Sequence, residues 1–375
     1  MKISQHKSTN VLFFCNFAEN NCNFAENNNN QKMTKKRIAF IVNPISGTCN
    51  KDVVPALVSK HIDTSLFDTN VVFTEYAGHA SELATSYVSE KYDIVVAVGG
   101  DGTINEVARS LVETQTALGI IPCGSGNGLA RHLMLPMNFG GALDIINMAE
   151  IHDLDYGIIN GHPFFCTCGM GFDAFISKKF AEAGKRGPLT YIENVLREGL
   201  SYKPETYELI LDGNEEQRYK AFLISVANAS QYGNDAYIAP QASMSDGFLD
   251  VVIIQPFDIL EAPQVGIDLL NKTLNKSSKI KCYKAKDIVI KRKCSGVIHY
   301  DGDPVEASSE LHITLRNKGI KMVVNPLADK KKRRPNLVQS AFSSLFNEMN
   351  SVREEVTNPT KHVKALNNFI QSKLS

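Results

Sequence analysis

The stretch DIVVAVGGDGTINEVARSL, residues 93 to 111, joins an apolar segment to a glycine-rich turn and then to an amphipathic helix. Residues 94–98 are apolar and mostly β-branched, as in a short strand that is buried on both faces. Gly99, Gly100 and Gly102 follow at once, and from Thr103 the apolar residues recur at helical spacing. Such a turn brings backbone N–H groups and the positive end of a helix dipole to one point. The stretch therefore predicts a phosphate-binding site.

One carboxylate, Asp101, lies within this turn. An anion among phosphate-binding amides repels the ligand unless a cation lies between them, so Asp101 is a candidate contact for Mg²⁺ bound to a nucleotide. The alternative interpretation is a tight turn with a capping Asp, because glycine-rich turns are common in α/β folds.

Two further glycine-containing loops also follow predicted strands: NPISG at 43–47 and GSGNG at 124–128. The segments read as strands at 38–42, 70–74, 94–98 and 118–121, with helical spacing between them, for example over 80–90. This alternation predicts a doubly wound, mainly parallel sheet of the Rossmann-like type. The three loops should then lie at the same edge of the sheet, where such folds bind ligands.

The pattern changes after about residue 157. Short alternating segments predict a β-rich second domain, which we expect to be a sandwich, with one helical stretch at about 188–200. The predicted strands lie at 162–168, 206–211, 219–227, 248–254, 287–291, 297–300 and 311–315. We divide the chain into a disordered extension (1–35), an α/β nucleotide-binding domain (36–157), a β-rich substrate domain (158–325) and a basic, amphipathic helical tail (326–375).

The composition narrows the class of protein. The chain has 375 residues, is 43% hydrophobic and carries no net charge, as in an ordinary globular protein. The absence of a basic excess and of Trp argues against nucleic-acid binding. Eight cysteines without a CxxC pair indicate reduced thiols in the cytoplasm. No apolar run approaches the roughly 20 residues that cross a bilayer, so we expect only peripheral membrane contact.

The amino terminus contains a perfect tandem repeat, CNFAENN at 15–21 and again at 22–28. The first 32 residues contain few large apolar side chains, so burial does not offset the entropy of ordering. We expect natural translation to start at Met33, just before the first strand.

The chain lacks GxxxxGK[ST], the HRD and DFG elements of protein kinases, and GxGxxG. NPISG, GGDGTINE, GSGNGLAR, GMGFDA, SDGFLDV and YDGDP instead occur in the order and spacing of one family. Over about residues 36–325 the chain resembles the diacylglycerol-kinase-type lipid kinases, whose bacterial branch is related to sphingosine and ceramide kinases. GGDGT alone is shared with NAD kinases.

The resemblance implies an ATP-dependent lipid kinase that uses Mg²⁺. It implies that the nucleotide contacts Asn43, Ser46, Thr74, Gly99, Gly100, Asp101, Gly102, Thr103, Glu106 and Ser125, with Asp101 acting through Mg²⁺. Asp301 of YDGDP would be the general base, and Asp303 stands where the family normally has Glu. Asp155 would face the acceptor or the metal network.

A second, structural Mg²⁺ is implied at the SDG turn, held by Asp246 and the main-chain oxygens of Ser243 and Phe248. The simpler interpretation of both Asp301 and Asp246 is an Asp-Gly turn between strands. For Asp301 the two interpretations are compatible, since a rigid turn can hold a base.

The acceptor stays open at this point. Gly128 occupies a position where many bacterial diacylglycerol kinases carry Asp, which shifts weight towards a sphingoid-base or ceramide-type kinase. A soluble NAD kinase-like enzyme and a non-catalytic nucleotide-binding protein are the alternatives outside lipid phosphorylation.

The carboxyl-terminal tail suggests how such an enzyme meets a lipid. Residues 330–334 are five consecutive basic residues, and apolar residues recur at helical spacing over 338–356. We expect peripheral contact with the inner face of the membrane or a homodimer; the alternative is a helix packed on the body of the protein.

Overall fold

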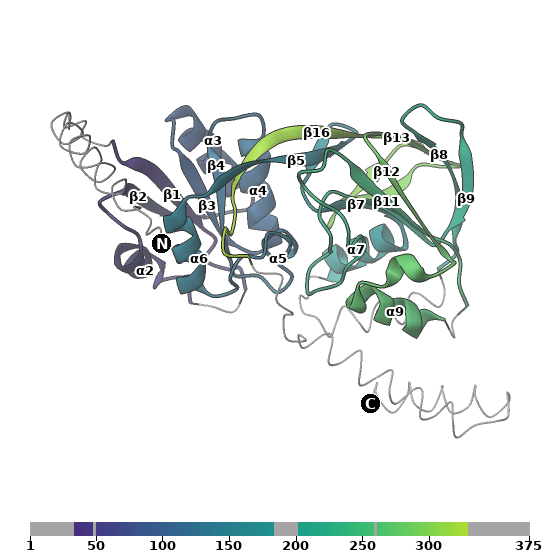
Figure 1. Cartoon of the computed structure of the whole chain (residues 1–375), viewed down its shortest axis with the longest axis horizontal. Helices are drawn as coiled ribbons and strands as arrows, with labels where there is room; N and C mark the ends of the chain where they lie inside the picture. Colours follow the sequence, from purple (N-terminus) through teal and green to yellow (C-terminus); the bar gives the residue numbers. More distant parts are fainter. Residues whose placement is uncertain (1–33, 48–49, 184–201, 259–260, 329–375) are drawn as a thin grey trace, which may run out of the picture.

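The computed structural model describes residues 34–47, 50–183, 202–258 and 261–328. They form two lobes that share one long strand (Figure 1). The predictions for residues 1–33, for the helix at about 188–200 and for the tail from 329 fall outside the described residues.

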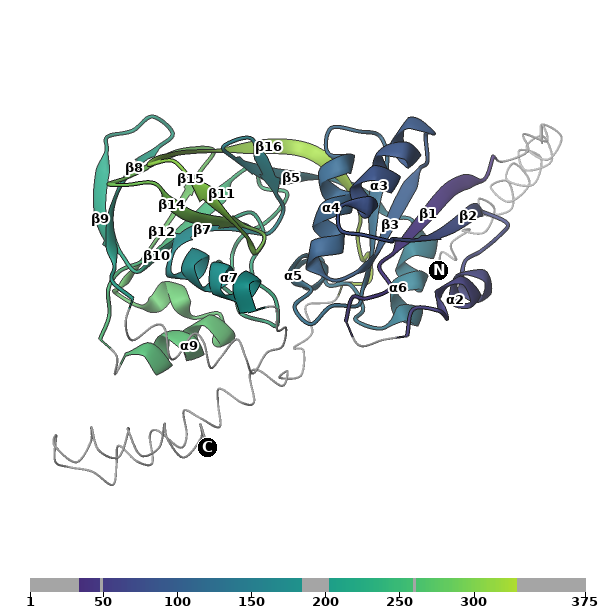
Figure 2. The ribbon, with the colours of Figure 1, turned by 180° about the vertical axis from the view of Figure 1, so that it is seen from behind.

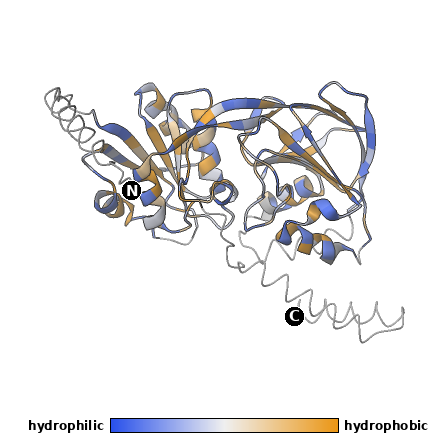
Figure 3. Ribbon diagram, viewed as in Figure 1, coloured by the Kyte–Doolittle hydropathy of each residue, from blue (hydrophilic) through white to orange (hydrophobic). Residues whose placement is uncertain are grey.

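The first lobe is the predicted parallel sheet with helices on both faces. Its strands are β1 (Lys36–Val42), β2 (Phe67–Phe73), β3 (Ile94–Gly99) and β4 (Ala117–Pro122), in the order β2-β1-β3-β4. Its helices are α2 (Val54–His61), α3 (His79–Ser89), α4 (Asp101–Leu111), α5 (Gly128–His132) and α6 (Phe139–Met148). Helices α2 and α6 pack together, as do α3 and α4. Every residue of β3 and β4 is buried, which explains their continuous apolar sequences (Figure 3).

The second lobe contains two sheets, as expected of a β-sandwich. A six-stranded antiparallel sheet has the order β12-β11-β10-β7-β14-β15. Its strands are β7 (Thr167–Gly171), β10 (Leu223–Ala227), β11 (Leu249–Ile254), β12 (Ile280–Ala285), β14 (Gly296–Tyr300) and β15 (Asp303–Ala307). Among the described residues, the helices of this lobe are α7 (Phe172–Ala183), α9 (Ala262–Asn271) and the 3₁₀ helix η1 (Leu274–Lys276). Helix α7 packs against β7, β14 and β15 (Figure 2).

The other sheet of the second lobe continues from the first lobe through β16 (Glu310–Val323). Its remaining strands are β5 (Ile151–Ile159), β6 (His162–Phe164), β8 (Glu205–Leu211), β9 (Gln217–Ala221) and β13 (Asp287–Arg292). Strand β16 pairs with β13 near its start and reaches β4 of the first lobe at Met322 (Figure 1). The boundary that we placed at residue 157 therefore falls within β5, which pairs with β16 along both lobes.

Two predicted strands are wrong as single elements. The segment 162–168 divides into β6 and β7 because the backbone N–H groups of Phe165 and Cys166 turn towards Asp301 instead of a neighbouring strand. The segment 219–227 divides at Phe222, where the chain leaves one sheet and enters the other. Apolar residues continue through both breaks, so the sequence pattern does not reveal them.

Candidate functional site

The three glycine-containing loops meet at one edge of the parallel sheet, as the topology predicts. Asn43 follows β1, and its Nδ2 donates a hydrogen bond of 2.9 Å to Oγ1 of Thr103 in α4. Gly47 has a φ of +62°, and a Cβ added there would lie 1.7 Å from the carbonyl oxygen of Cys123. NPISG thus rests directly on the start of the second glycine loop, where a larger residue does not fit.

The GGDGT turn and the GSGNG loop also touch backbone to backbone. A Cβ on Gly124 would lie 2.7 Å from Cα of Gly100. The carboxylate of Asp101 crosses between the loops and accepts hydrogen bonds of 2.8 Å from the N–H groups of Asn127 and Gly128. Burial raises the pKa of Asp101, although these amide bonds oppose the shift. Asp101 therefore joins two phosphate-type loops, a role that neither interpretation of the sequence included.

The remaining predicted nucleotide contacts surround these loops. Ser46 and Thr74 are buried at the ends of β1 and β2, whereas Ser125 is exposed. Glu106 lies on α4, and its Oε2 accepts a hydrogen bond of 3.2 Å from the N–H of Gly78. The sequence reasoning missed Lys51, which is buried beneath NPISG with its Nζ 2.6 Å from the carbonyl oxygen of Ser46.

Asp301 lies in a tight hairpin turn between β14 and β15. Asp301 and Gly302 have φ values of +51° and +88°, and Tyr300 pairs with Asp303 across the hairpin. Positive φ at both central residues is the type I′ geometry, which fits the Asp-Gly sequence. The hairpin interpretation is thus confirmed, and the turn fixes the direction of the Asp301 side chain.

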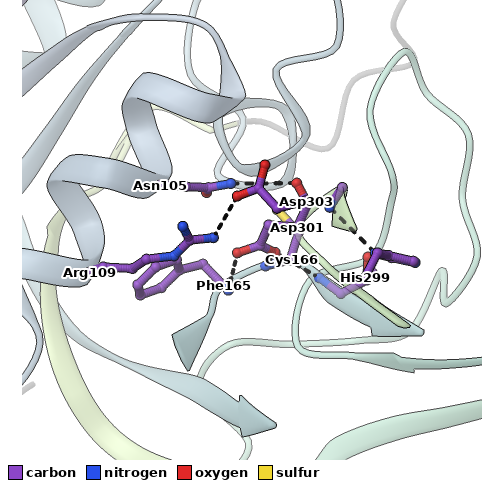
Figure 4. A network of polar contacts seen from close by, with 9 residues as sticks. Asn105, Arg109, Phe165, Cys166, His299, Asp301 and Asp303 are labelled. Carbon is purple, nitrogen blue, oxygen red and sulfur yellow. Dashed lines mark hydrogen bonds and ion pairs between the residues drawn. The ribbon is translucent and has the colours of Figure 1, made fainter. Parts of the chain in front are cut away.

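The carboxylate of Asp301 accepts three backbone hydrogen bonds from the connection between β6 and β7. The distances are 2.8 Å from Phe165 to Oδ2, and 2.7 Å and 3.1 Å from Cys166 and Thr167 to Oδ1 (Figure 4). Burial raises the pKa of Asp301 to about 6 in spite of these bonds, which favour the charged form. A carboxylate with this pKa is mostly ionised at neutral pH but still accepts a proton readily.

One face of α4 joins the two glycine loops to this turn. Asp101, Asn105 and Arg109 stand four residues apart and so share a helix face. Nδ2 of Asn105 lies 3.5 Å from the carbonyl oxygen of Asp301, and Nη2 of Arg109 lies 3.0 Å from Oδ2 of Asp303 (Figure 4). The shorter side chain of Asp303 therefore reaches a partner. The polar i, i+4, i+8 spacing in the sequence was the signal that could have identified Asn105 and Arg109.

The carboxylate of the SDG turn pairs with a lysine side chain. Nζ of Lys284 lies 2.5 Å from Oδ2 of Asp246 and 3.5 Å from Oδ2 of Asp250. The other oxygen of Asp246 accepts a hydrogen bond from the N–H of Phe248. Among the described residues, no three His, Cys, Asp or Glu side chains gather as a metal site. In this structure Lys284 pairs with Asp246, and the Mg²⁺ site expected at Asp246, Ser243 and Phe248 stays a prediction.

Asp155, expected to face the acceptor or the metal network, lies against the SDG turn, and its role stays a prediction. Asp155 is fully buried, and its carboxylate accepts bonds of 2.9 Å from the N–H of Gly247, 2.9 Å from Nδ2 of Asn317 and 2.8 Å from the N–H of Lys318. It fastens β5 to the SDG turn and to the irregular part of β16.

Comparisons with known proteins agree with this arrangement. A family model of the diacylglycerol kinase catalytic domain matches residues 37–159, and one of the YegS C-terminal NAD kinase beta sandwich-like domain matches residues 166–324. The chain belongs to the diacylglycerol-kinase-type lipid kinase family. The predictions of this family, of its two-part fold and of an ATP-dependent lipid kinase are confirmed.

Individual relatives cover most of the chain. Diacylglycerol kinases of Staphylococcus aureus strains RF122 and JH9 are both 27% identical over 275 residues, which is 72% of this chain and 86% of each relative. A crystal structure of a diacylglycerol kinase from Bacillus anthracis strain Sterne is 24% identical, with a TM-score of 0.62. It is matched over 79% of this chain and 99% of its own length, which shows that the fold is shared.

Proposed function

We propose that this lipid kinase transfers the γ-phosphate of ATP to the hydroxyl group of diacylglycerol, with Asp301 as the general base. The observation that carries the assignment is the carboxylate of Asp301, whose pKa burial raises to about 6. Three backbone amides hold it, and α4 joins its turn to the phosphate-type loops. The acceptor follows from the names of the Staphylococcus aureus relatives.

The proposed reaction needs few groups. The ionised carboxylate of Asp301 accepts the proton of the lipid hydroxyl group. At the same time the hydroxyl oxygen of the lipid forms a bond to the γ-phosphorus, and the bond between the γ-phosphorus and the ADP oxygen breaks. The products are phosphorylated lipid and ADP. Phosphoryl transfer depends mainly on positioning and on stabilising charge, so a rigid base beside amide-rich loops suffices.

ATP is the nucleotide that the family implies, and Mg²⁺ is part of the proposal. Mg²⁺ in kinases is commonly held by one or two carboxylates together with the substrate phosphates, and it neutralises those phosphates. Asp101 suits this arrangement because its two oxygens offer about four lone-pair sites, of which the amides of Asn127 and Gly128 take one on each oxygen. The nucleotide contacts inferred from Asn43, Ser46, Thr74, Gly99, Gly100, Gly102, Thr103, Glu106 and Ser125 belong to the same proposal.

The choice of diacylglycerol over a sphingoid base rests on the names of the relatives. Gly128, in contrast, favours a sphingoid-base or ceramide-type kinase. The structure adds a local reason for Gly128. A Cβ added there would lie 3.2 Å from the carbonyl oxygen of Tyr232 in the second lobe. The missing carboxylate is therefore linked to close packing of the two lobes, which does not depend on the acceptor.

We further propose that the protein is cytoplasmic and binds the inner face of the membrane through the basic segment 330–334 and the apolar positions after it. The described residues include no helix long and apolar enough to span a bilayer. Sedimentation with anionic and neutral vesicles, for the full chain and for a chain ending at residue 328, tests this. Equal vesicle binding would end the membrane proposal, and an unchanged oligomeric mass would end the homodimer alternative.

The central assay is incubation with labelled ATP, Mg²⁺ and, separately, diacylglycerol, monoacylglycerol, sphinganine, ceramide and NAD. We expect label in phosphatidic acid, and its loss in Asp301→Asn. Label confined to sphinganine or ceramide would replace the acceptor, and label on NAD alone would overturn the proposed function.

A further inference from the structure

The turn that holds Asp301 rests on a buried histidine. His299 lies two residues before Asp301 on β14 and is only 2% exposed. Its Nδ1 lies 3.4 Å from the N–H of Gly302, and its Nε2 lies 3.1 Å from Oδ2 of Asp173 at the start of α7. The imidazole thus stands between the Asp301–Gly302 turn and a buried carboxylate.

These contacts assign the proton on the ring. A backbone N–H only donates, so Nδ1 of His299 accepts from Gly302 and carries no proton. Nε2 then carries the proton and donates it to Asp173. The hydroxyl group of Tyr232 donates to the same oxygen of Asp173 at 3.1 Å, and the other oxygen accepts from the N–H of Ala174. Each of the two hydrogen bonds of the His299 ring therefore has a single direction: from Gly302 to Nδ1, and from Nε2 to Asp173.

Gly169 provides the space for this pair. It is the first glycine of GMGFDA and pairs with His299 between β7 and β14. A Cβ added to Gly169 would lie 2.2 Å from Oδ2 of Asp173 and 2.9 Å from Nε2 of His299. The glycine and the Asp of this motif thus serve one structural unit, which no local pattern in the sequence indicates.

The same unit extends to the nucleotide loops. Tyr232 belongs to the segment 231–235, which packs on the GSGNG loop: its carbonyl faces Gly128, and the N–H of Asn234 donates 3.2 Å to the carbonyl oxygen of Gly126. A buried ion pair of 3.2 Å between Arg131 and Asp235 fastens the segment. Contacts therefore run without a break from the second glycine loop through Tyr232, Asp173 and His299 to the turn of Asp301.

We propose that Asp173 and His299 are positioning residues that hold the Asp301–Gly302 turn in register with the nucleotide loops. The inference rests on the proposed role of Asp301 as base. Apolar residues would fill this interior without the cost of burying a charge, so a buried pair whose hydrogen bonds have fixed directions is explained by the position it imposes.

The test uses variants that separate the two bonds of the ring. His299→Asn keeps an acceptor near the position of Nδ1, His299→Gln keeps a donor near the position of Nε2, and Asp173→Asn removes the charge at nearly constant shape. We expect kcat to fall about 100-fold in His299→Gln and Asp173→Asn, because small displacements of a catalytic group cost about this much. His299→Asn should retain more activity, and KM for ATP should change little in all three.

A matched control is the exposed pair His312 and Glu310, whose Nε2 and Oε1 lie 2.9 Å apart in the same lobe. His312→Gln and Glu310→Gln should leave kcat unchanged. The pH dependence of kcat is the second readout, because a displaced Asp301 loses amide bonds and the acid limb of the profile moves, whereas a general loss of stability lowers the profile without moving it.

The outcomes separate the two proposals. If Asp301→Asn keeps wild-type activity, the proposed function fails first. If Asp301→Asn is inactive while Asp173→Asn and His299→Gln keep the wild-type kcat and pH profile, the positioning role is overturned. It is also overturned if any loss of activity in His299→Asn and His299→Gln only follows the unfolded fraction measured by circular dichroism.

Discussion

The backbone N–H of Cys166 donates a hydrogen bond of 2.7 Å to Oδ1 of Asp301, across 135 positions of sequence. This bond and its two neighbours tie a hairpin turn to the connection between β6 and β7. They keep the carboxylate in one direction, while burial keeps its pKa close to neutral.

Activity should fall as the pH falls through about 6, because protonated Asp301 cannot accept the hydroxyl proton. Its pKa is raised from 3.8 to about 6 in the folded protein, so protonation of Asp301 stabilises the fold as the pH falls from about 6 towards 4. Protonation of Asp301 therefore lowers activity without destabilising the folded protein. Initial rates at saturating ATP from pH 5 to 8, with circular dichroism at each pH, check this. A rate that is constant down to pH 5 would contradict it.

Gly47→Ala should destabilise the protein and weaken ATP binding together. The left-handed conformation costs a residue with a Cβ roughly 1–2 kcal/mol, and that Cβ would collide with the carbonyl of Cys123. We expect a lower melting temperature and a raised Kd for ATP. Gly140→Ala in α6 is the control, because its Cβ would meet only ordinary contacts at 3.7 Å and beyond. Similar melting temperatures for the two variants would refute the close packing of NPISG.

Gly128→Asp should lower activity even though relatives of the bacterial branch are expected to carry Asp there. The new side chain would press on the carbonyl of Tyr232 and place a second carboxylate beside Asp101, whose Oδ1 accepts from the N–H of Gly128. Gly128→Ala tests the space alone and should have a smaller effect. Measurement of kcat and KM for ATP distinguishes them; equal effects would remove the charge argument.

Lys284 should make the stability of the second lobe independent of Mg²⁺. The ammonium group of Lys284 already pairs with Asp246 and lies 3.5 Å from Asp250, so EDTA should not change the melting temperature of the wild type. In Lys284→Met two carboxylates lose their counter-charge, and added Mg²⁺ should restore part of the lost stability. A fall in the wild-type melting temperature with EDTA would instead support the metal site first expected at Asp246.

The sequence predicted what depends on local pattern. The buried strand 94–98 and its glycine turn, the neighbouring loops at 43–47 and 124–128, and the Asp-Gly hairpin at 301 all follow from periodicity and turn chemistry. The family resemblance supplied the lipid kinase and Asp301 as the candidate base.

Contacts between distant segments were beyond this kind of reasoning. Nothing near Asp155 in sequence indicates that Asn317 and Gly247 enclose it, and nothing near His299 indicates Asp173. The same holds for β16, whose ordinary alternation hides that it joins both lobes. These features depend on which strands become neighbours, which a single sequence does not state.

The most direct test of the central claim is the transfer of labelled phosphate from ATP to diacylglycerol by Asp301→Asn. The control is Asp212→Asn, because Asp212 also precedes a glycine at positive φ and its Oδ1 accepts backbone bonds of 2.8 Å and 2.9 Å. We predict that Asp301→Asn binds ATP and remains folded but forms phosphatidic acid at least about 100-fold more slowly, whereas Asp212→Asn keeps the wild-type rate. Wild-type phosphatidic acid formation by Asp301→Asn would contradict the account.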